Sequence, residues 1–303
     1  MLNLRELRYT QVKMNKKQAT KIGLILASPL LIYFLIFFIY PIFLLFRYAF
    51  TNSAGSFSLS NFVFMSKDPI LYSSLFNTLY YFIGSVAVQF SGGFLAAIVL
   101  SSYTGRLKNA FRMILYIPLT ISPIVIALIW LLIFNPTYGP LDYILRAPIN
   151  WLGSINLAMP TIIIANGWEY IPFVFLIIYA GLQAVPKQYY EAASIDGMNR
   201  LQTFRYITMP SIKPILIVAF LLNSIGILQG FTLVYVLTNG GPGFSTYILS
   251  FYIYKVAFTY FNLHYAAALS LLFILIIGAF VYVMLKLTSV ERYLGLRREG
   301  GEQ

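Results

Sequence analysis

Residues 186–210 read Pro186-Lys-Gln-Tyr-Tyr-Glu-Ala-Ala-Ser-Ile-Asp-Gly-Met-Asn-Arg-Leu-Gln-Thr-Phe-Arg-Tyr-Ile-Thr-Met-Pro210. This polar and charged stretch separates two apolar runs, at about 156–183 and 214–238. Each run exceeds the roughly 20 apolar residues that a helix needs to cross a bilayer. The stretch is therefore predicted to be a loop between two spans of an all-α integral membrane protein.

Helix punctuation within this loop predicts two short helices with a sharp bend between them, lying on the membrane surface. Pro186 suits the first turn of a helix, and Gly197 can supply the left-handed residue that ends it. Asn199 can cap a second helix, and Pro210 then marks the return into the bilayer. Helical spacing predicts that one face of the first helix carries Tyr189, Ala192, Ala193 and Asp196.

Apolar runs elsewhere in the chain complete a set of six predicted transmembrane helices. Of the 303 residues, 59% are hydrophobic and 10% are charged, whereas a soluble domain carries about a quarter charged residues. The charges sit in short clusters between the runs, so lipid is the expected solvent for most of the chain. The other four runs lie at about 22–48, 74–101, 113–134 and 264–285.

Positive residues predict the orientation of these spans, because Lys and Arg favour the cytoplasmic side. With both ends inside, 17 Lys and Arg residues face the cytoplasm and 4 face outward. The chain then consists of a basic cytoplasmic segment 1–21, a six-span domain 22–288 and a cytoplasmic tail 289–303. The net charge of +12 reflects this orientation and does not indicate a nucleic-acid partner. The first run, at about 25 residues, is too long for a signal peptide and is predicted to remain as an anchor.

Two outer segments, 135–155 and 239–262, are rich in Tyr, Pro and Gly. The second contains an apolar aromatic stretch at 247–261, which is predicted to form a short helix at or dipping into the outer interface. A seventh span is the alternative, but the run is short and an extra crossing would reverse the charge bias of the residues after it.

Composition excludes several classes of catalytic site. The chain has no Cys and a single His, which excludes thiol chemistry and disfavours a zinc site. It also lacks a Gly-rich phosphate-binding loop followed by Lys and Ser or Thr. A membrane-embedded enzyme would need a buried Ser–His pair or paired Asp residues, for which His264 is badly placed. We therefore predict a chain without catalytic residues, metal or cofactor.

The loop at 186–210 has two physical interpretations. It can rest on lipid as an interfacial amphipathic segment, or it can bind another protein. Glu191 and Asp196 are acidic, in a leaflet that attracts basic segments, and the small residues Ala192, Ala193 and Gly197 form a low ridge that fits a protein groove. An ion-coupled carrier with Glu169 as its proton site is a further alternative, but it leaves this loop unexplained.

The spacing of residues 191–210 resembles the cytoplasmic signature of ABC-importer permeases. Glu191-Ala192-Ala193 is followed after three residues by Gly197, and after nine more by Ile207-Thr-Met-Pro210. Only Met209 departs from the signature, where it replaces a Leu. The resemblance implies a type I ABC-importer permease fold whose cytoplasmic coupling helix sits in a cleft of an ATPase. The residues it implies in that contact are Glu191, Ala192, Ala193, Asp196, Gly197, Ile207 and Pro210.

Other segments resemble sugar permeases of the six-span, maltose-permease-like type, as the first member of a permease pair. They include Ile117-Pro118, residues 133–139 and residues 237–242, and the likeness covers about 22–288. It implies half of a translocation pore for a sugar or oligosaccharide in the cell membrane. The implied partners are a second permease subunit, two copies of an ATPase that binds ATP and Mg²⁺, and an extracellular solute-binding protein. Glycerol-3-phosphate or another small polar solute is the alternative cargo, since related permeases share these signatures.

A substrate path is predicted on the fourth and fifth spans. Glu169 is the only acidic residue well inside a predicted span, and such groups are functional candidates. Pairing with a neighbouring helix, or hydration near the outer interface, is the alternative for it. By resemblance, the maltose site uses the positions of Tyr170, Phe173, Ile227 and Gly230, where the residue types differ here. The full predicted path, which combines aromatic faces with amides, comprises Trp168, Glu169, Tyr170, Phe173, Asn223, Ile227, Gln229 and Gly230.

Overall fold

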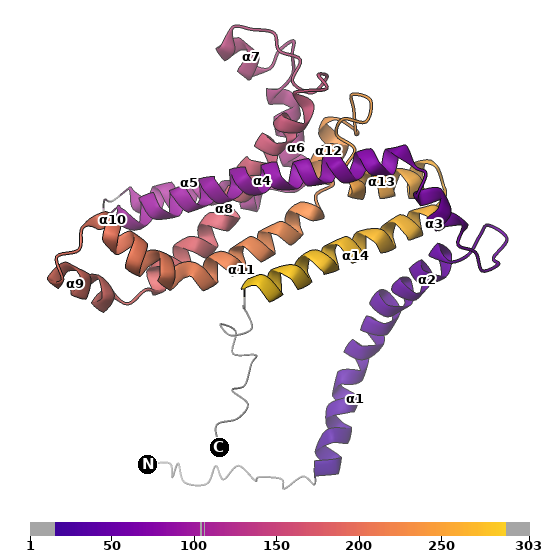
Figure 1. Cartoon of the computed structure of the whole chain (residues 1–303), viewed down its shortest axis with the longest axis horizontal. Coiled ribbons are helices and arrows are strands. Elements are labelled where there is room, and N and C mark those ends of the chain that lie inside the picture. The colour runs from indigo at the N-terminus through magenta and orange to yellow at the C-terminus, as the bar shows by residue number, and fades with distance from the viewer. Residues whose placement is uncertain (1–15, 104, 106, 289–303) are drawn as a thin grey trace, which may run out of the picture.

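The computed structural model describes residues 16–103, 105 and 107–288, and every secondary-structure element within them is helical (Figure 1). The predicted all-α fold is confirmed. In chain order the elements, with π-helical turns marked η, are α1 Lys16–Phe34, η1 Leu35–Ile39, α2 Tyr40–Ala49, α3 Ser60–Met65, α4 Pro69–Ser102, α5 Lys108–Thr120, α6 Pro123–Ile133, α7 Pro140–Leu145, α8 Ala158–Ala184, α9 Lys187–Ile195, α10 Arg200–Thr203, η2 Phe204–Thr208, α11 Met209–Leu228, α12 Thr232–Leu237, α13 Leu249–Tyr254, η3 Lys255–Thr259 and α14 Leu263–Thr288.

The helices α4 and α8 form the most extensive helix pair in the described part of the chain. From Tyr81 to Ala97 the buried residues of α4 recur at every fourth position, which places them in one stripe along the helix. Side chains of α8 lie directly over glycines of α4. A Cβ atom added at Gly84 would come within 2.6 Å of Ile163, and one at Gly93 within 2.7 Å of Val174. Small residues therefore let the two backbones approach closely, as helices in lipid commonly do.

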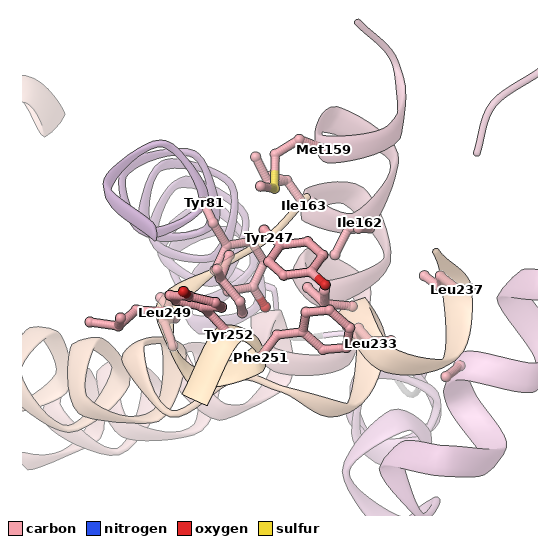
Figure 2. Close-up of a cluster of buried hydrophobic side chains, with 14 of the residues drawn as sticks. Tyr81, Met159, Ile162, Ile163, Leu233, Leu237, Tyr247, Leu249, Phe251 and Tyr252 are labelled. Carbon is pink, nitrogen blue, oxygen red and sulfur yellow. The ribbon is translucent and has the colours of Figure 1, made fainter. Parts of the chain in front are cut away.

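A buried apolar cluster joins α4 and α8 at one end of the pair, which we call the outer end because the charge pattern predicts that it faces outward. Figure 2 shows two members of this cluster, Tyr81 of α4 and Met159 of α8. Leu233 of α12 and Phe251 of α13 complete it from the C-terminal half of the chain. The short helices α12 and α13 thus close the outer end of the pair.

Asp68 anchors three helices at this outer end. It precedes α4 as the N-cap, where its carboxylate accepts a hydrogen bond from the backbone N–H of Ile70 at 2.9 Å. Its other oxygen accepts hydrogen bonds from the hydroxyls of Tyr252 on α13 and Tyr265 on α14, both at 2.5 Å. Burial, reinforced by Asp68, raises the pKa of Tyr252, so this hydroxyl remains a donor at physiological pH.

Four of the six predicted spans are continuous helical stretches that match their predicted ranges closely, at residues 20–49, 69–102, 158–184 and 263–288. The first of them differs in its packing. No residue in its most apolar window is buried within the chain, and it contacts α14 mainly through α2. Figure 1 accordingly shows α1 leading away from the other helices.

The third predicted span, 113–134, is not one straight helix. It divides into α5 and α6, whose axes differ by 101°. Pro118 lies inside α5, and Pro123 begins α6. A proline disfavours helical conformation in the residue before it, and Ser122 is extended accordingly, with ψ of 138°. The prediction took the apolar run as one unbroken helix; with the bent helices as one span, the total is six.

The fifth predicted span, 214–238, begins earlier than expected, ends at Leu237 close to its predicted end, and is interrupted within. The helix runs from Arg200 through η2 to Leu228, breaks at residues 229–231, and resumes as the separate helix α12. Gly230 lies in the break, where the helix-destabilising flexibility of glycine favours an interruption. The predicted short helix at 247–261 is confirmed as α13 with η3, while its depth in the membrane stays a prediction.

Replacing Gly93 with Ala tests the close contact of α4 with α8. The added Cβ would lie 2.7 Å from Val174 Cβ and 2.8 Å from the backbone nitrogen of Phe175, so one of the helices must shift. We expect a loss of about 1–3 kcal/mol in stability, measured as a lower thermal midpoint of the full chain in detergent. Gly226→Ala is the matched control, since its Cβ would meet nothing within 4 Å. Equal midpoints for the two variants would contradict the proposed role of the contact.

Candidate functional site

The helix α9 ends in a bend that the sequence predicts correctly. Gly197 has a φ of 72°, the left-handed conformation that glycine adopts without steric cost. Its N–H donates to the carbonyl of Ser194 at 3.2 Å, and the N–H of Met198 donates to the carbonyl of Ala193 at 2.9 Å. These two bonds form a Schellman motif, which satisfies carbonyls at the end of a helix. The predicted role of Gly197 as the residue that ends this helix is confirmed.

The predicted cap at Asn199 is also confirmed, but the helix that follows differs from the prediction. Asn199 Oδ1 accepts from the backbone N–H of Gln202, and Gln202 Oε1 accepts from that of Asn199, both at 2.9 Å. The prediction of a short surface helix ending before Pro210 is wrong, because one continuous helix runs from Arg200 to Leu228. The π turn η2 precedes Pro210, and its wider i→i−5 hydrogen bonding accommodates a residue that lacks an N–H donor.

The face of α9 that points away from the spans carries most of the predicted coupling residues. Glu191, Ala192 and Asp196 are exposed there, as is Gly197 in the bend. Ala193 does not share that face, because its side chain is 1% exposed and packs toward the spans. Ile207 is half-buried in η2, and Pro210 is exposed at the start of α11.

Exposed apolar side chains accompany these residues, and one of them, Ile195, was missed by the sequence reasoning. Ile195, at the tip of α9, is 86% exposed, and Leu201 is 73% exposed. Tyr189 is exposed as well. Bulky apolar groups in an otherwise polar loop are typical of protein contacts rather than of a solvated turn. The signal in the sequence was the charged residue next to two of them, Asp196 after Ile195 and Arg200 before Leu201.

Polar side chains are buried in the middle of the helix pair α4 and α8. Gln89 of α4 is fully buried, and its Nε2 donates to Asn166 Oδ1 of α8 at 2.6 Å. Gln89 Oε1 has no partner in the described chain, and the same holds for Asn223 Nδ2 and Ser224 Oγ of α11. Buried polar atoms are normally paired. Because these atoms have no hydrogen-bond partner in the described chain, they are available to bind water, a partner subunit or a passing solute.

The predicted path residues do not all point into one space. Glu169 is 5% exposed on α8, and Asn223 and Ile227 are buried on α11, where Ile227 belongs to the apolar cluster. Trp168 lies against Trp130 of α6, with ring centroids 6.0 Å apart. The remaining predicted path residues are half-buried or exposed, namely Tyr170, Phe173, Gln229 and Gly230.

Tyr81 of α4 links the two parts of the predicted path, and the sequence reasoning missed it. It is fully buried and lies close to Glu169 and Tyr170 of α8. Its hydroxyl also lies 3.0 Å from the place that a Cβ of Gly230 would occupy. A larger residue at 230 would therefore displace Tyr81. The signal available in the sequence was the spacing of Tyr81, Ser85 and Gln89 at every fourth residue of the second span.

Residues 89–289 match the family described as binding-protein-dependent transport system inner membrane component. The chain belongs to this family. The matched range includes α9, its bend and the whole of α11, and it extends over more than half of the chain. The match confirms the predicted resemblance to importer permeases. It also confirms the predicted location in a membrane.

Individual relatives of this inner membrane component support the assignment to this family. It is 35% identical over 292 residues to the trehalose/maltose transport system permease protein MalF of Thermococcus litoralis, covering 91% of this chain and 97% of that protein. It is 32% identical over 272 residues to the arabinooligosaccharides transport system permease protein AraP of Bacillus subtilis, covering 86% and 87%. A chain from the crystal structure of a bacterial ABC transporter for import of the acidic polysaccharide alginate matches with a TM-score of 0.82 at 23% identity, covering 90% and 97%. The type I importer permease fold is therefore confirmed.

The Glu169 carboxylate and the Tyr170 ring offer a test of the predicted path. We expect Glu169→Gln and Tyr170→Ala to lower the initial rate of solute uptake roughly tenfold or more, since a hydrogen bond to a charged group contributes about 1.5–3 kcal/mol. Uptake by proteoliposomes of the assembled transporter measures the effect. Ile164→Ala, on the exposed side of the same helix, is the control. Wild-type uptake in both path variants would place the path elsewhere.

Proposed function

We propose that this chain is the permease subunit of an ATP-driven importer for a sugar or oligosaccharide. It forms half of the translocation pore and performs no catalysis itself. A separate ATPase, present in two copies, hydrolyses ATP with Mg²⁺ and acts on this chain through residues 186–210. Both termini and this loop face the cytoplasm in the proposed orientation, which follows from the distribution of positive charge.

The observation that carries the proposal is the surface of α9. A lipid-bound amphipathic helix would place its apolar residues toward the membrane. The side chains that α9 turns toward the spans are those of Tyr190 and Ala193, whereas Ile195 and Tyr189 are exposed beside Glu191. This arrangement supports a protein partner over a lipid surface, and the partner that the family's signature implies is an ATPase.

An unpartnered first span supports a second permease subunit as a further partner. The apolar side chains of α1 and η1, such as Leu26, Leu30 and Phe37, are exposed, and this span contributes no buried residue in its most apolar window. Helices in lipid associate through close packing, and within the described part of this first span it is α2 that packs against α14. We therefore infer that α1 packs against the second subunit of the pore.

The outer loop supports docking of an extracellular binding protein. Figure 1 shows α7 projecting beyond the other helices. Tyr143 and Ile144 on α7 are strongly exposed, while Asp142 holds the loop in shape by accepting hydrogen bonds from Trp151 Nε1 at 2.6 Å and from Ile149 N at 3.1 Å. A rigid loop with exposed aromatic and apolar side chains is typical of a protein-binding surface.

The chemistry of the predicted path favours a neutral sugar over glycerol-3-phosphate. The path residues include aromatic rings, the amides of Asn223 and Gln229, and the carboxyl group of Glu169, but no Lys or Arg. Phosphate recognition normally uses cationic side chains. Relatives named for trehalose/maltose and for arabinooligosaccharides support the same choice.

Charge reversal at Glu191 tests the coupling to an ATPase. We expect Glu191→Lys to lower solute uptake more than about tenfold while ATP hydrolysis persists, because truncating one partner of an interfacial charge pair costs several kcal/mol. Uptake and ATP hydrolysis are measured side by side in proteoliposomes of the assembled importer.

Two variants control this experiment. Glu191→Gln removes the charge without reversing it and is expected to have a smaller effect. Ser53→Lys places a positive charge in an exposed turn at the other end of the spans and should leave coupling intact. Full uptake in Glu191→Lys would show that the loop does not carry the ATPase contact.

A further inference from the structure

A cavity of about 670 Å³ lies between α9 and the ends of the spans. Its walls come from the last turn of α4, the end of α8, the side of α9 that faces the spans, and the first turns of the helix that begins at Arg200. This volume falls within the roughly 300–1,000 Å³ of sites that hold small molecules. None of the predicted coupling residues, Glu191 and Asp196 included, belongs to its lining.

The charged residues that line this cavity are both cations. Lys187, at the start of α9, and Arg200, at the start of the next helix, contribute to its walls, and none of the acidic residues within the described ranges does. The lining also includes the Gln183 amide and the hydroxyls of Ser102 and Tyr190. Two cations with neighbouring hydrogen-bonding groups suit an anionic, oxygen-rich ligand such as a phosphate group.

Apolar residues form the rest of the cavity wall. Ile98 of α4, Leu182 of α8 and Phe204 of η2 line it together with the polar groups. Since α4 ends at Ser102 and α8 at Ala184, the cavity lies where these two spans leave the bilayer. A ligand with a phosphate and an adjoining hydrocarbon part matches both halves of such a wall.

We propose that this cavity binds the phosphate headgroup of an anionic membrane lipid. Lys187 and Arg200 hold the phosphate, and the apolar wall receives the first part of an acyl chain. Basic pockets between membrane helices on the cytoplasmic side are a recognised setting for such headgroups. The proposal rests on the proposed function only for the leaflet involved, because that function places α9 in the cytoplasm.

The bound lipid would brace the coupling loop against the spans. Tyr190 lines the cavity from α9, and its hydroxyl accepts a hydrogen bond from Thr208 of η2 at 3.4 Å. Glu191, Ala192 and Ile195 lie on the exposed side of α9 and remain available to an ATPase. A lipid and an ATPase can therefore occupy opposite sides of α9 at the same time.

Binding of phosphatidylglycerol to the assembled importer tests the site. The importer, delipidated in neutral detergent, is titrated with dioleoyl phosphatidylglycerol, and native mass spectrometry measures the affinity of each retained lipid. Lys187→Gln with Arg200→Gln should weaken one binding event roughly 30-fold, given the contribution of each cation near an anionic headgroup. The matched control, Lys67→Gln with Lys255→Gln, removes the same charge at the outer end and should retain that event.

Further arms separate the alternatives. The charge-conserving double variant Lys187→Arg with Arg200→Lys should keep the lipid. Ser102→Phe should exclude the lipid by filling the cavity while both cations remain. Because these variants act independently of the glutamine double variant, the test stands even if one variant fails to assemble. Unchanged affinity in the glutamine double variant, or an equal loss in its control, overturns the proposal. Displacement of the lipid by millimolar inorganic phosphate would identify a free anion as the ligand and would overturn the lipid assignment.

The same preparations distinguish this proposal from the proposed function. If uptake depends on Glu191 but the glutamine double variant keeps its lipid, the lipid site alone is wrong. If the lipid is lost as expected while Glu191→Lys imports normally, the ATPase contact alone is wrong.

Discussion

The close approach of α4 and α8 is the constraint on which the remaining structure depends. Lipid offers little driving force for burying apolar side chains, so packing between backbones and hydrogen bonds must hold the pair together. Glycines 84, 92 and 93 admit Ile163, Ile171 and Val174, and the bond from Gln89 to Asn166 fixes the register of the two helices. Other elements then attach to α4: Thr78 Oγ1 accepts from the N–H of Leu249, Asn77 donates to the carbonyl of Phe244, and Asp68 binds two tyrosines.

This constraint also explains why the interior holds unpaired polar atoms. The rings of Phe90 and Phe220 lie 5.7 Å apart, and the Gly230 backbone approaches Tyr81, so α11 runs antiparallel to α4. Asn223 and Ser224 therefore lie between these two contacts, at about the level of Ser85 and Gln89. Small residues that allow close packing leave no side chain long enough to satisfy every polar atom there. Such atoms are costly in a membrane protein unless they serve a solute or a partner, which agrees with a pore that is completed by a second subunit.

The sequence is informative where local chemistry decides the conformation, and less so where packing does. Pro186, Gly197 and Asn199 act through their own backbone and side chains, and the helix start, the bend and the cap lie where these residues predict. The bend between α5 and α6 was also encoded locally, by Pro118 and Pro123, but apolar length alone obscured it. By contrast, the burial of Tyr81 beside Glu169, the inward side of Ala193 and the isolation of α1 depend on which helices become neighbours. Residues far apart in the chain determine that, and a single sequence does not reveal it.

The continuity of the helix from Arg200 to Leu228 changes how the loop can act on the interior. Two surface helices joined to the span at Pro210 would have placed a hinge between the loop and the membrane. Instead, the bend at Gly197 lies directly before a single helix that carries Asn223 and Ser224, about 35 Å from Asn199 at the usual rise of a helix. The bend at Gly197 and one continuous helix therefore join α9 to these polar residues. The break at residues 229–231 ends that helix beside Tyr81, whereas α12 packs against α6 and α13 against α4.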